Sequence, residues 1–326
     1  MTLPELQAII VSAGGGSNAL AYAEFLLDKI NRLETSGRYE NLLSQLRSAR
    51  EPGDFRGRVL EVNFACTFVE HGIELAYGAS QGMTGDIDFL WNVAEHKVFI
   101  ELKLLGQDRA TRDEINRQLE AHGVSSTLVT DDARDVSRLQ LDILQKASTR
   151  KFNPHPQITW VNLVAIDVAE LQLGTMDIAD CLLATGGNAL VSQHCHPACL
   201  RENVVGVFEV LQGKALTPAQ TEWVSRLHTL AAGVPQPQSY LHGVIFLFRV
   251  PKERAALSYE LSASGTQASL PPTSPVPLKA RFGKCSRVSR DRTISATFIP
   301  MRRPPTVPIA RRLLKREWVR IKNELA

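Results

Sequence analysis

Gly85-Asp86-Ile87-Asp88-Phe89-Leu90 is the first of two neighbouring apolar runs that carry charged residues, and Val98-Phe99-Ile100-Glu101-Leu102-Lys103-Leu104 is the second. A short polar segment, residues 92–96, separates them. Apolar runs of this length on either side of a short polar turn predict a β-hairpin. We expect its strands to cover residues 86–91 and 97–105.

The alternation of side chains along a strand decides which of these charges share a face. Asp86 and Asp88 are expected on one face of the first strand, and Glu101 and Lys103 on one face of the second. The apolar residues around Glu101 then point the other way, into a hydrophobic layer. Because unpartnered charges are costly to bury, these groups either neutralise one another or hold a divalent cation.

The short pattern glutamate, any residue, lysine is not specific by itself. It occurs twice, as Glu95-His96-Lys97 in the predicted turn and as Glu101-Leu102-Lys103 inside the predicted strand. Only the second copy lies beside Asp88. The alternative is a surface hairpin whose ion pairs are only structural, since exposed Glu–Lys pairs contribute little to stability.

Elements on both sides of the hairpin predict an α/β fold. Expected helices cover residues 17–30, 38–49, 55–70, 109–122, 131–149, 217–230 and 309–325, and further strands cover 73–77, 158–168, 204–211 and 241–250. Thr185-Gly186-Gly187-Asn188 is typical of a turn. The expected organisation is an N-terminal helical segment over 1–50, a core with a C-terminal α/β extension over 51–261, and a Pro/Ser-rich basic arm with a terminal helix over 262–326.

The segment from Gly57-Arg58-Val59-Leu60-Glu61 to Lys103 resembles the PD-(D/E)xK nuclease superfamily. The resemblance consists of a helix carrying a glutamate, a glycine at its end, a strand and the hairpin, and the Gly-acidic-Ile-Asp hairpin is similar to the Holliday-junction-resolvase-like branch. It departs from the superfamily name in one position, where Ile87 stands for proline. The fold it implies is a restriction-endonuclease-like mixed sheet flanked by helices.

The resemblance also implies roles for the charged residues. Asp88 and Glu101 would ligate Mg²⁺ or Mn²⁺, with the main-chain carbonyl of Leu102 and, from the preceding helix, Glu61. Lys103 would stabilise the attacking hydroxide or the developing phosphorane charge. The metal would lower the pKa of its bound water and neutralise the phosphate.

Four further residues are secondary candidates for this site. Asp86 would be an additional metal ligand, and Glu70 is the substitute if Glu61 does not reach the site. Superfamily members often carry a polar residue beside the site that contacts the phosphate, and Gln140 or Arg138 would serve. The alternative for these last two is an ordinary solvated helix face.

The net charge of +3 is unevenly distributed. Residues 277–326 hold 14 Lys/Arg against 3 Asp/Glu, a local charge of +11, which leaves −8 for residues 1–276. Basic segments release counterions from phosphate backbones, so this arm points to a polyanionic partner such as duplex or branched DNA. The alternative is a solvated tail without a partner.

The cysteines and the apolar runs bear on the location of the protein. Five cysteines in 326 residues favour a reducing compartment. The sequence contains no run of 18 apolar residues, so it predicts no transmembrane helix. We therefore expect a cytoplasmic protein without membrane contact. His194-Cys195-His196 together with Cys199 has zinc-compatible spacing, but one short loop rarely supplies four ligands. Whether these residues bind zinc stays open.

The sequence therefore predicts a metal-dependent endonuclease that hydrolyses phosphodiester bonds of DNA, in restriction, repair or defence. One alternative is a catalytically silent protein of the same fold that binds nucleic acid or a protein partner. Another is an interaction protein in which the hairpin charges are only structural. Many superfamily members act as dimers, so a homodimer is compatible with the resemblance.

Overall fold

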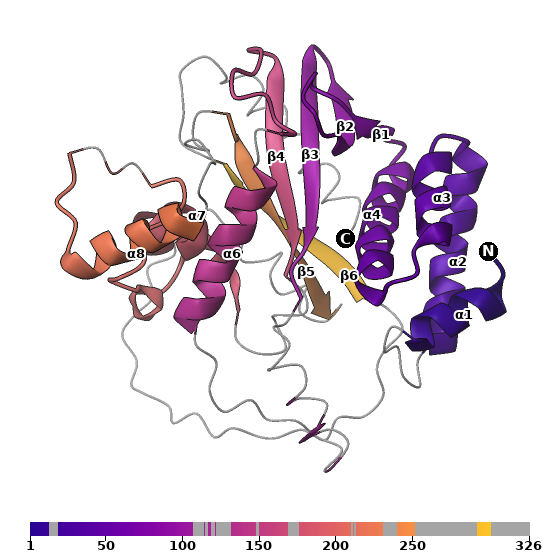
Figure 1. The fold of residues 1–326 in the computed structure, drawn as a ribbon, viewed down its shortest axis with the longest axis horizontal. Helices are drawn as coiled ribbons and strands as arrows, with labels where there is room; N and C mark the ends of the chain where they lie inside the picture. Colours follow the sequence, from indigo (N-terminus) through magenta and orange to yellow (C-terminus); the bar gives the residue numbers. More distant parts are fainter. Residues whose placement is uncertain are drawn as a thin grey trace, which may run out of the picture.

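The structure is a computed structural model that describes residues 1–12, 19–106, 114, 117–118, 121, 132–147, 150–168, 176–209, 211, 213–230, 240–251 and 292–300 (Figure 1). Its centre is a six-stranded sheet whose strands follow one another in chain order. The strands are β1 (Leu75–Ala79), β2 (Ile87–Val93), β3 (His96–Leu104), β4 (Trp160–Asp167), β5 (Gly243–Pro251) and β6 (Arg292–Pro300). The first three strands are antiparallel, β3, β4 and β5 are parallel, and β6 is antiparallel to β5.

Helices cover both faces of this sheet. They are α1 (Leu3–Ser12), α2 (Ala19–Ser36), α3 (Glu40–Ser48) and α4 (Pro52–Glu70), then α6 (Asp132–Lys146), α7 (Ile178–His194), the 3₁₀ helix η3 (Pro197–Cys199) and α8 (Pro218–Leu230). In Figure 1, α1 to α4 lie on one side of the sheet and α6 to α8 on the other. No helix in the described part of the chain is both long and apolar enough to cross a membrane.

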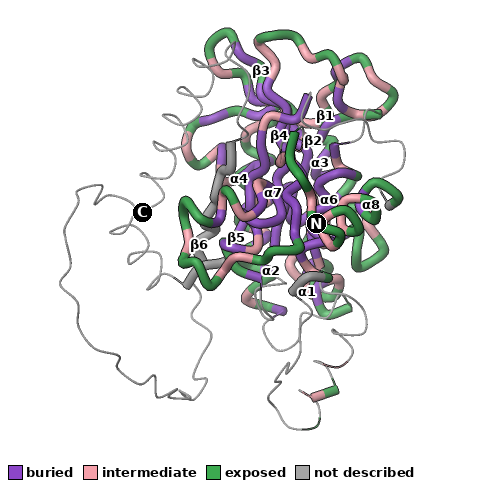
Figure 2. Tube along the Cα trace, turned by 90° about the vertical axis from the view of Figure 1, so that its left-hand side faces the viewer, coloured by how far each residue is buried: buried purple, intermediate pink, exposed green. Residues whose placement is uncertain are grey.

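Two apolar layers fill the space between the sheet and its helices. Val98, Ile100 and Leu102 of β3 belong to the layer under α2 and α4, whereas Phe99 belongs to the layer under α6 and α7. Figure 2 shows β3 and β4 mostly buried inside and the exposed residues on the outer surface. Because parallel strands covered on both faces read as continuous apolar runs, β4 has no alternation of polar residues.

The structure confirms the predicted mixed α/β class and the alternation along β3. It also confirms the strands predicted over 73–77, 86–91, 97–105, 158–168 and 241–250, with shifts of a few residues at their ends. The boundaries expected at residues 50 and 261 stay predictions. The predicted arm contains β6, while the predicted helix over 309–325 and most of that over 109–122 lie outside the described residues.

The strand predicted over residues 204–211 is wrong. Val204, Val205 and Val207 are buried, but the segment pairs with α7 instead of a strand: the N–H groups of Val207 and Phe208 donate to the carbonyls of Ala184 and Thr185. Helix α7 itself was not predicted, because the Gly186-Gly187 pair indicated a turn. The predicted turn lies inside α7, because two helical stretches meet at Gly187, whose backbone is not helical (φ 65°, ψ −166°). This break leaves carbonyls of the preceding helical turn for the loop to pair with.

The contact between this loop and α7 depends on Gly206. A Cβ atom at Gly206 would lie 2.2 Å from the backbone N of Gly187 and 2.7 Å from the carbonyl oxygen of Thr185, both of which are main-chain atoms. We predict that Gly206→Ala lowers the free energy of unfolding by roughly 3 kcal/mol, measured by chemical denaturation. Gly53→Ala is the control, because nothing lies within 4 Å of its Cβ, and alanine should be neutral or slightly stabilising there. Equal stability of the two variants would contradict this account of the loop.

Candidate metal centre

The candidate site lies where the pairing of β2 and β3 ends. The last register pair in this direction is Phe89 with Ile100, and Asp88 and Glu101 are the residues that follow this pair on the two strands. The main-chain N–H of Leu102 donates to Oδ2 of Asp88 over 2.7 Å, which replaces a backbone hydrogen bond of the ladder by a side-chain carboxylate. The N–H and C=O of a strand residue point to the same edge of the strand, so the carbonyl of Leu102 also points toward β2.

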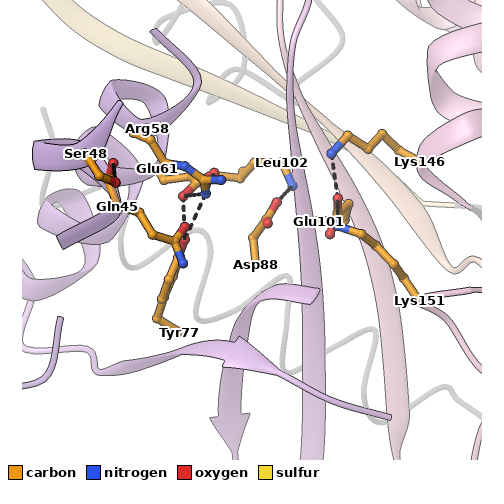
Figure 3. A network of polar contacts seen from close by, with 10 residues as sticks. All are labelled: Gln45, Ser48, Arg58, Glu61, Tyr77, Asp88, Glu101, Leu102, Lys146 and Lys151. Atoms are coloured by element: carbon orange, nitrogen blue, oxygen red, sulfur yellow. Dashed lines mark hydrogen bonds and ion pairs between the residues drawn. The ribbon is translucent and has the colours of Figure 1, made fainter. Parts of the chain in front are cut away.

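Glu101 is a completely buried carboxylate. Its Oε1 accepts from Nζ of Lys146 at 2.6 Å and from Nζ of Lys151 at 2.5 Å (Figure 3). Its Oε2 is buried and has no hydrogen-bond partner among the described residues. Lys146 comes from the last turn of α6, and Lys151 from the segment that follows, so the polypeptide after β3 supplies the positive charge that this buried carboxylate needs.

Asp88 is influenced by two other carboxylates. Burial, together with the negative charges of Glu101 and Glu61, raises the pKa of Asp88 to about 7, whereas Lys146 and the N–H of Leu102 act in the opposite direction. Figure 3 shows Asp88 between Glu61 on the α4 side and Glu101 on the α6 side. Carboxylates from both sides of the sheet thus oppose the ionisation of Asp88.

Glu61 projects from α4 and is held by two neighbours. Nη1 of Arg58 donates to both of its carboxylate oxygens at 2.8 Å, and the hydroxyl of Tyr77 lies 2.9 Å from its Oε2. Burial raises the pKa of Tyr77, so this hydroxyl stays a donor. The predicted arrival of Glu61 near Asp88 from the preceding helix therefore agrees with the structure, but its carboxylate already has a cationic partner.

Lys103 does not lie against Glu101. Its Nζ is 3.1 Å from Oδ1 of Asp142 on α6, so the two residues of the Glu-x-Lys pattern contact different positions of the same helix. Lys146 and Lys151 occupy the place beside Glu101 that the sequence assigned to Lys103. Lys146 follows Asp142 by one helical turn, a spacing that could have suggested it, whereas no sequence signal marks Lys151.

Gln140 is a correction to the predicted phosphate contact. The side chain is completely buried: its amide N donates to the carbonyls of Ala184 and Val205, and its oxygen accepts from the indole N–H of Trp223. It neither faces a phosphate nor belongs to a solvated face, and instead links α6, α7 and α8. Arg138, the other candidate, is partly buried, and its Nη1 has no hydrogen-bond partner among the described residues.

Two of the secondary carboxylates lie apart from this arrangement. Asp86 is exposed and precedes β2, so it does not share a strand face with Asp88 as predicted. Glu70 accepts from Arg32 at 3.0 Å, on the side of α4 that faces α2, and so does not substitute for Glu61. Neither residue has a contact that ties it to Glu101.

The described residues contain no group of three or more His, Cys, Asp or Glu side chains close enough to hold a metal ion. Asp88, Glu101 and Glu61 therefore do not form a three-carboxylate site, because Glu61 and Glu101 are each held by their own cations on opposite sides of Asp88. The finding applies equally to the zinc-compatible loop, where Cys195 and Cys199 are free thiols and Nδ1 of His196 accepts from the N–H of Ala198.

A smaller donor set nevertheless fits a hard cation. Asp88, the unpaired Oε2 of Glu101 and the carbonyl of Leu102 are oxygen donors at one end of the β2–β3 ladder. Mg²⁺ is commonly bound by one or two carboxylates and keeps several of its waters. The residues present therefore fit Mg²⁺ or Mn²⁺ bound by two carboxylates, with water or substrate completing the coordination.

Comparisons with protein-family models, with curated proteins and with solved structures returned no significant match to this chain.

The raised pKa of Asp88 predicts a pH dependence of stability. Between pH 4 and pH 7 the unfolded chain has lost this proton while the folded chain retains it, so the free energy of unfolding should fall as pH rises through this window, and then level off. The expected loss is on the order of 3–4 kcal/mol in metal-free buffer.

Asp88→Asn should remove most of this pH dependence and be more stable than the wild type at pH 8, as measured by urea denaturation at several pH values. Asp86→Asn is the matched control, because Asp86 is exposed and should retain the wild-type profile. Identical profiles for Asp88→Asn and the wild type would show that the environment of Asp88 is not as described.

Proposed function

We propose that this chain is a metal-dependent endonuclease that hydrolyses phosphodiester bonds of DNA on a restriction-endonuclease-like fold. The observation that carries the proposal is a completely buried Glu101 that retains an unpaired oxygen and whose negative charge opposes the ionisation of Asp88. A divalent cation would stabilise two buried carboxylates whose negative charges oppose each other. The order of α4 with its glutamate, β1 and the β2–β3 hairpin supports the same superfamily resemblance.

In this proposal Asp88, Glu101 and the carbonyl of Leu102 hold the ion. When bound, Mg²⁺ or Mn²⁺ supplies a water of lowered pKa and positive charge at the scissile phosphate. Lys146 and Lys151 place two ammonium groups next to Glu101, where they can pair with phosphate oxygens. Lys103 would take part in stabilising the hydroxide only after leaving Asp142.

A second candidate is a catalytically silent protein of the same fold that binds nucleic acid or a protein partner. It is favoured by the internal pairing of the site: Glu61 is held by Arg58, Glu101 by two lysines and Lys103 by Asp142. A silent site would have no need to release any of these pairs. Cleavage assays separate the two candidates directly.

We predict that Asp88→Asn and Glu101→Gln each lower Mg²⁺-dependent nicking of plasmid DNA by at least about 10³-fold, because each removes a charged ligand of the ion. Circular dichroism should show that both variants retain the fold. The chain supplies its own control: Glu95→Gln alters the other Glu-x-Lys copy, whose glutamate is exposed in the β2–β3 turn. This control should cleave like the wild type.

Two results would contradict the proposal. If purified wild-type protein cleaves neither duplex, branched nor single-stranded DNA with Mg²⁺ or Mn²⁺, the silent candidate takes its place. If the protein cleaves DNA and Asp88→Asn cleaves equally well, the chemistry belongs to another site.

DNA is the proposed partner because of the basic C-terminal arm. Residues 301–326 contain 8 Lys/Arg against 2 Asp/Glu, and their removal leaves β6 in place. We predict that a chain ending at residue 300 binds duplex DNA more weakly and with a shallower dependence of log Kd on log salt concentration, since fewer phosphates are neutralised. Fluorescence anisotropy between about 50 and 200 mM salt measures both. An unchanged salt dependence would exclude the arm from DNA binding.

A further inference from the structure

Two lysines converge on a single oxygen of Glu101, which is one more cation than that carboxylate requires. Both ammonium groups lie on Oε1, at 2.6 Å for Lys146 and 2.5 Å for Lys151, and Oε2 is left without a partner. Among the residues that the structure describes, no cationic group lies within hydrogen-bond distance of Asp88, which accepts the N–H of Leu102. Once Asp88 is ionised, the two carboxylates and two lysines together have no net charge.

We propose that Lys146 and Lys151 take the place of the divalent cation in the metal-free protein and become phosphate-binding groups once a metal ion displaces them from Glu101. The proposal rests on the proposed function and identifies how metal and substrate binding are coupled at the same site. It requires that the lysines can leave Glu101, that they return to the same place, and that their departure follows from metal binding.

The side chains of both lysines have a route away from Glu101. Lys146 and Lys151 retain 28% and 31% of their side-chain exposure, whereas Glu101 has none. A lysine ammonium on a flexible four-carbon stem can therefore reach solvent or a bound phosphate while its backbone stays in place. Glu101, fixed in the middle of β3, cannot move in the same way.

The backbone that carries Lys151 is anchored on both sides. The N–H of Gly85 donates to the carbonyl of Arg150 at 2.8 Å, and the N–H of Asn153 donates to Oε1 of Gln81 at 2.8 Å. Gln81 is itself buried and donates to Asn162 of β4. These bonds join the segment around Lys151 to the loop before β2 and to the sheet, so the lysine is directed at Glu101 by a built framework.

Lys146 is positioned by α6, which packs on β3 through buried residues. The same helix is linked to α7 and α8 by Gln140. A helix fixed at both of these contacts keeps the last turn, and therefore Lys146, over Glu101.

Electrostatic repulsion by the metal ion is the reason why the lysines would leave Glu101. A divalent cation on Asp88 and Glu101 supplies the neutralisation that the lysines provide in its absence, and it repels ammonium groups at such short distances. The released ammonium groups then lack an acceptor, and a phosphodiester provides one with charge-assisted hydrogen bonds. Metal and DNA should therefore each strengthen the binding of the other, by the same factor.

Mn²⁺ binding to the full chain tests the displacement without relying on catalysis. Lys146→Met and Lys151→Met remove the charge and keep the stem, and isothermal titration should show Mn²⁺ binding about tenfold or more tightly in each, because one competing cation is gone. Lys214→Met is the matched control, since Lys214 pairs with Glu209 in another part of the structure and should leave Mn²⁺ affinity unchanged. Lys146→Arg retains the charge and should bind Mn²⁺ like the wild type, which separates charge from packing.

DNA binding tests whether the displaced lysines become phosphate-binding groups. With Ca²⁺ present in place of Mg²⁺, wild-type protein should bind a labelled duplex more tightly than in EDTA, and the double variant Lys146→Met/Lys151→Met should lose that gain. Unchanged or weaker Mn²⁺ binding in both single variants would overturn the displacement. If the lysine variants fail this test but the wild type still cleaves DNA, the displacement is wrong and the proposed nuclease function stands. If the wild type does not bind Mn²⁺ at all and Glu101→Gln leaves DNA cleavage unchanged, both proposals fail.

Discussion

A carboxylate that water cannot reach must be neutralised by the protein, and Glu101 in the middle of β3 is such a group. Breaking a buried ion pair by removing one partner typically costs several kcal/mol, because the remaining charge stays desolvated. The chain after β3 is therefore constrained to deliver cations to this one position. Helix α6 and the segment after it do so with Lys146 and Lys151, and the position of β3 against α6 follows from this requirement as well as from apolar packing.

The same constraint ties together parts of the chain that lie far apart in sequence. Lys151 reaches Glu101 only because the loop before β2 and the segment after α6 are joined by hydrogen bonds. Asp88 reaches Leu102 only because β2 and β3 cease to pair beyond Phe89 and Ile100. The end of the hairpin is thus held by polar groups. A change in the charge of the site should therefore affect both the loop before β2 and the segment after α6.

The strands and the hairpin could be predicted because their signals are local. Period-two alternation identified which face of β3 carries Glu101, and the uniform apolar run identified β4 as buried on both faces. The pairing of charges across elements could not be predicted, since it depends on how α6 is placed over the sheet. Lys103 therefore meets Asp142, and Gln140 meets α7 and α8 in the interior, although the sequence alone favoured other partners. The strand predicted around Val205 was wrong because its apolar residues pack against the kinked helix α7.

The internal pairing of the site does not make a purely structural role the simpler explanation. Replacing a buried ion pair by apolar residues of similar volume is often neutral or stabilising, so stability alone gives no reason to keep a carboxylate and two lysines under α6. Asp88 adds to the difficulty, because burial and the charges of Glu101 and Glu61 oppose its ionisation. Strong perturbation of this kind is concentrated at functional sites. An arrangement that is unfavourable for the folded chain alone would become favourable if the two carboxylates bound a divalent cation, which is the physical reason why we propose a catalytic role for it.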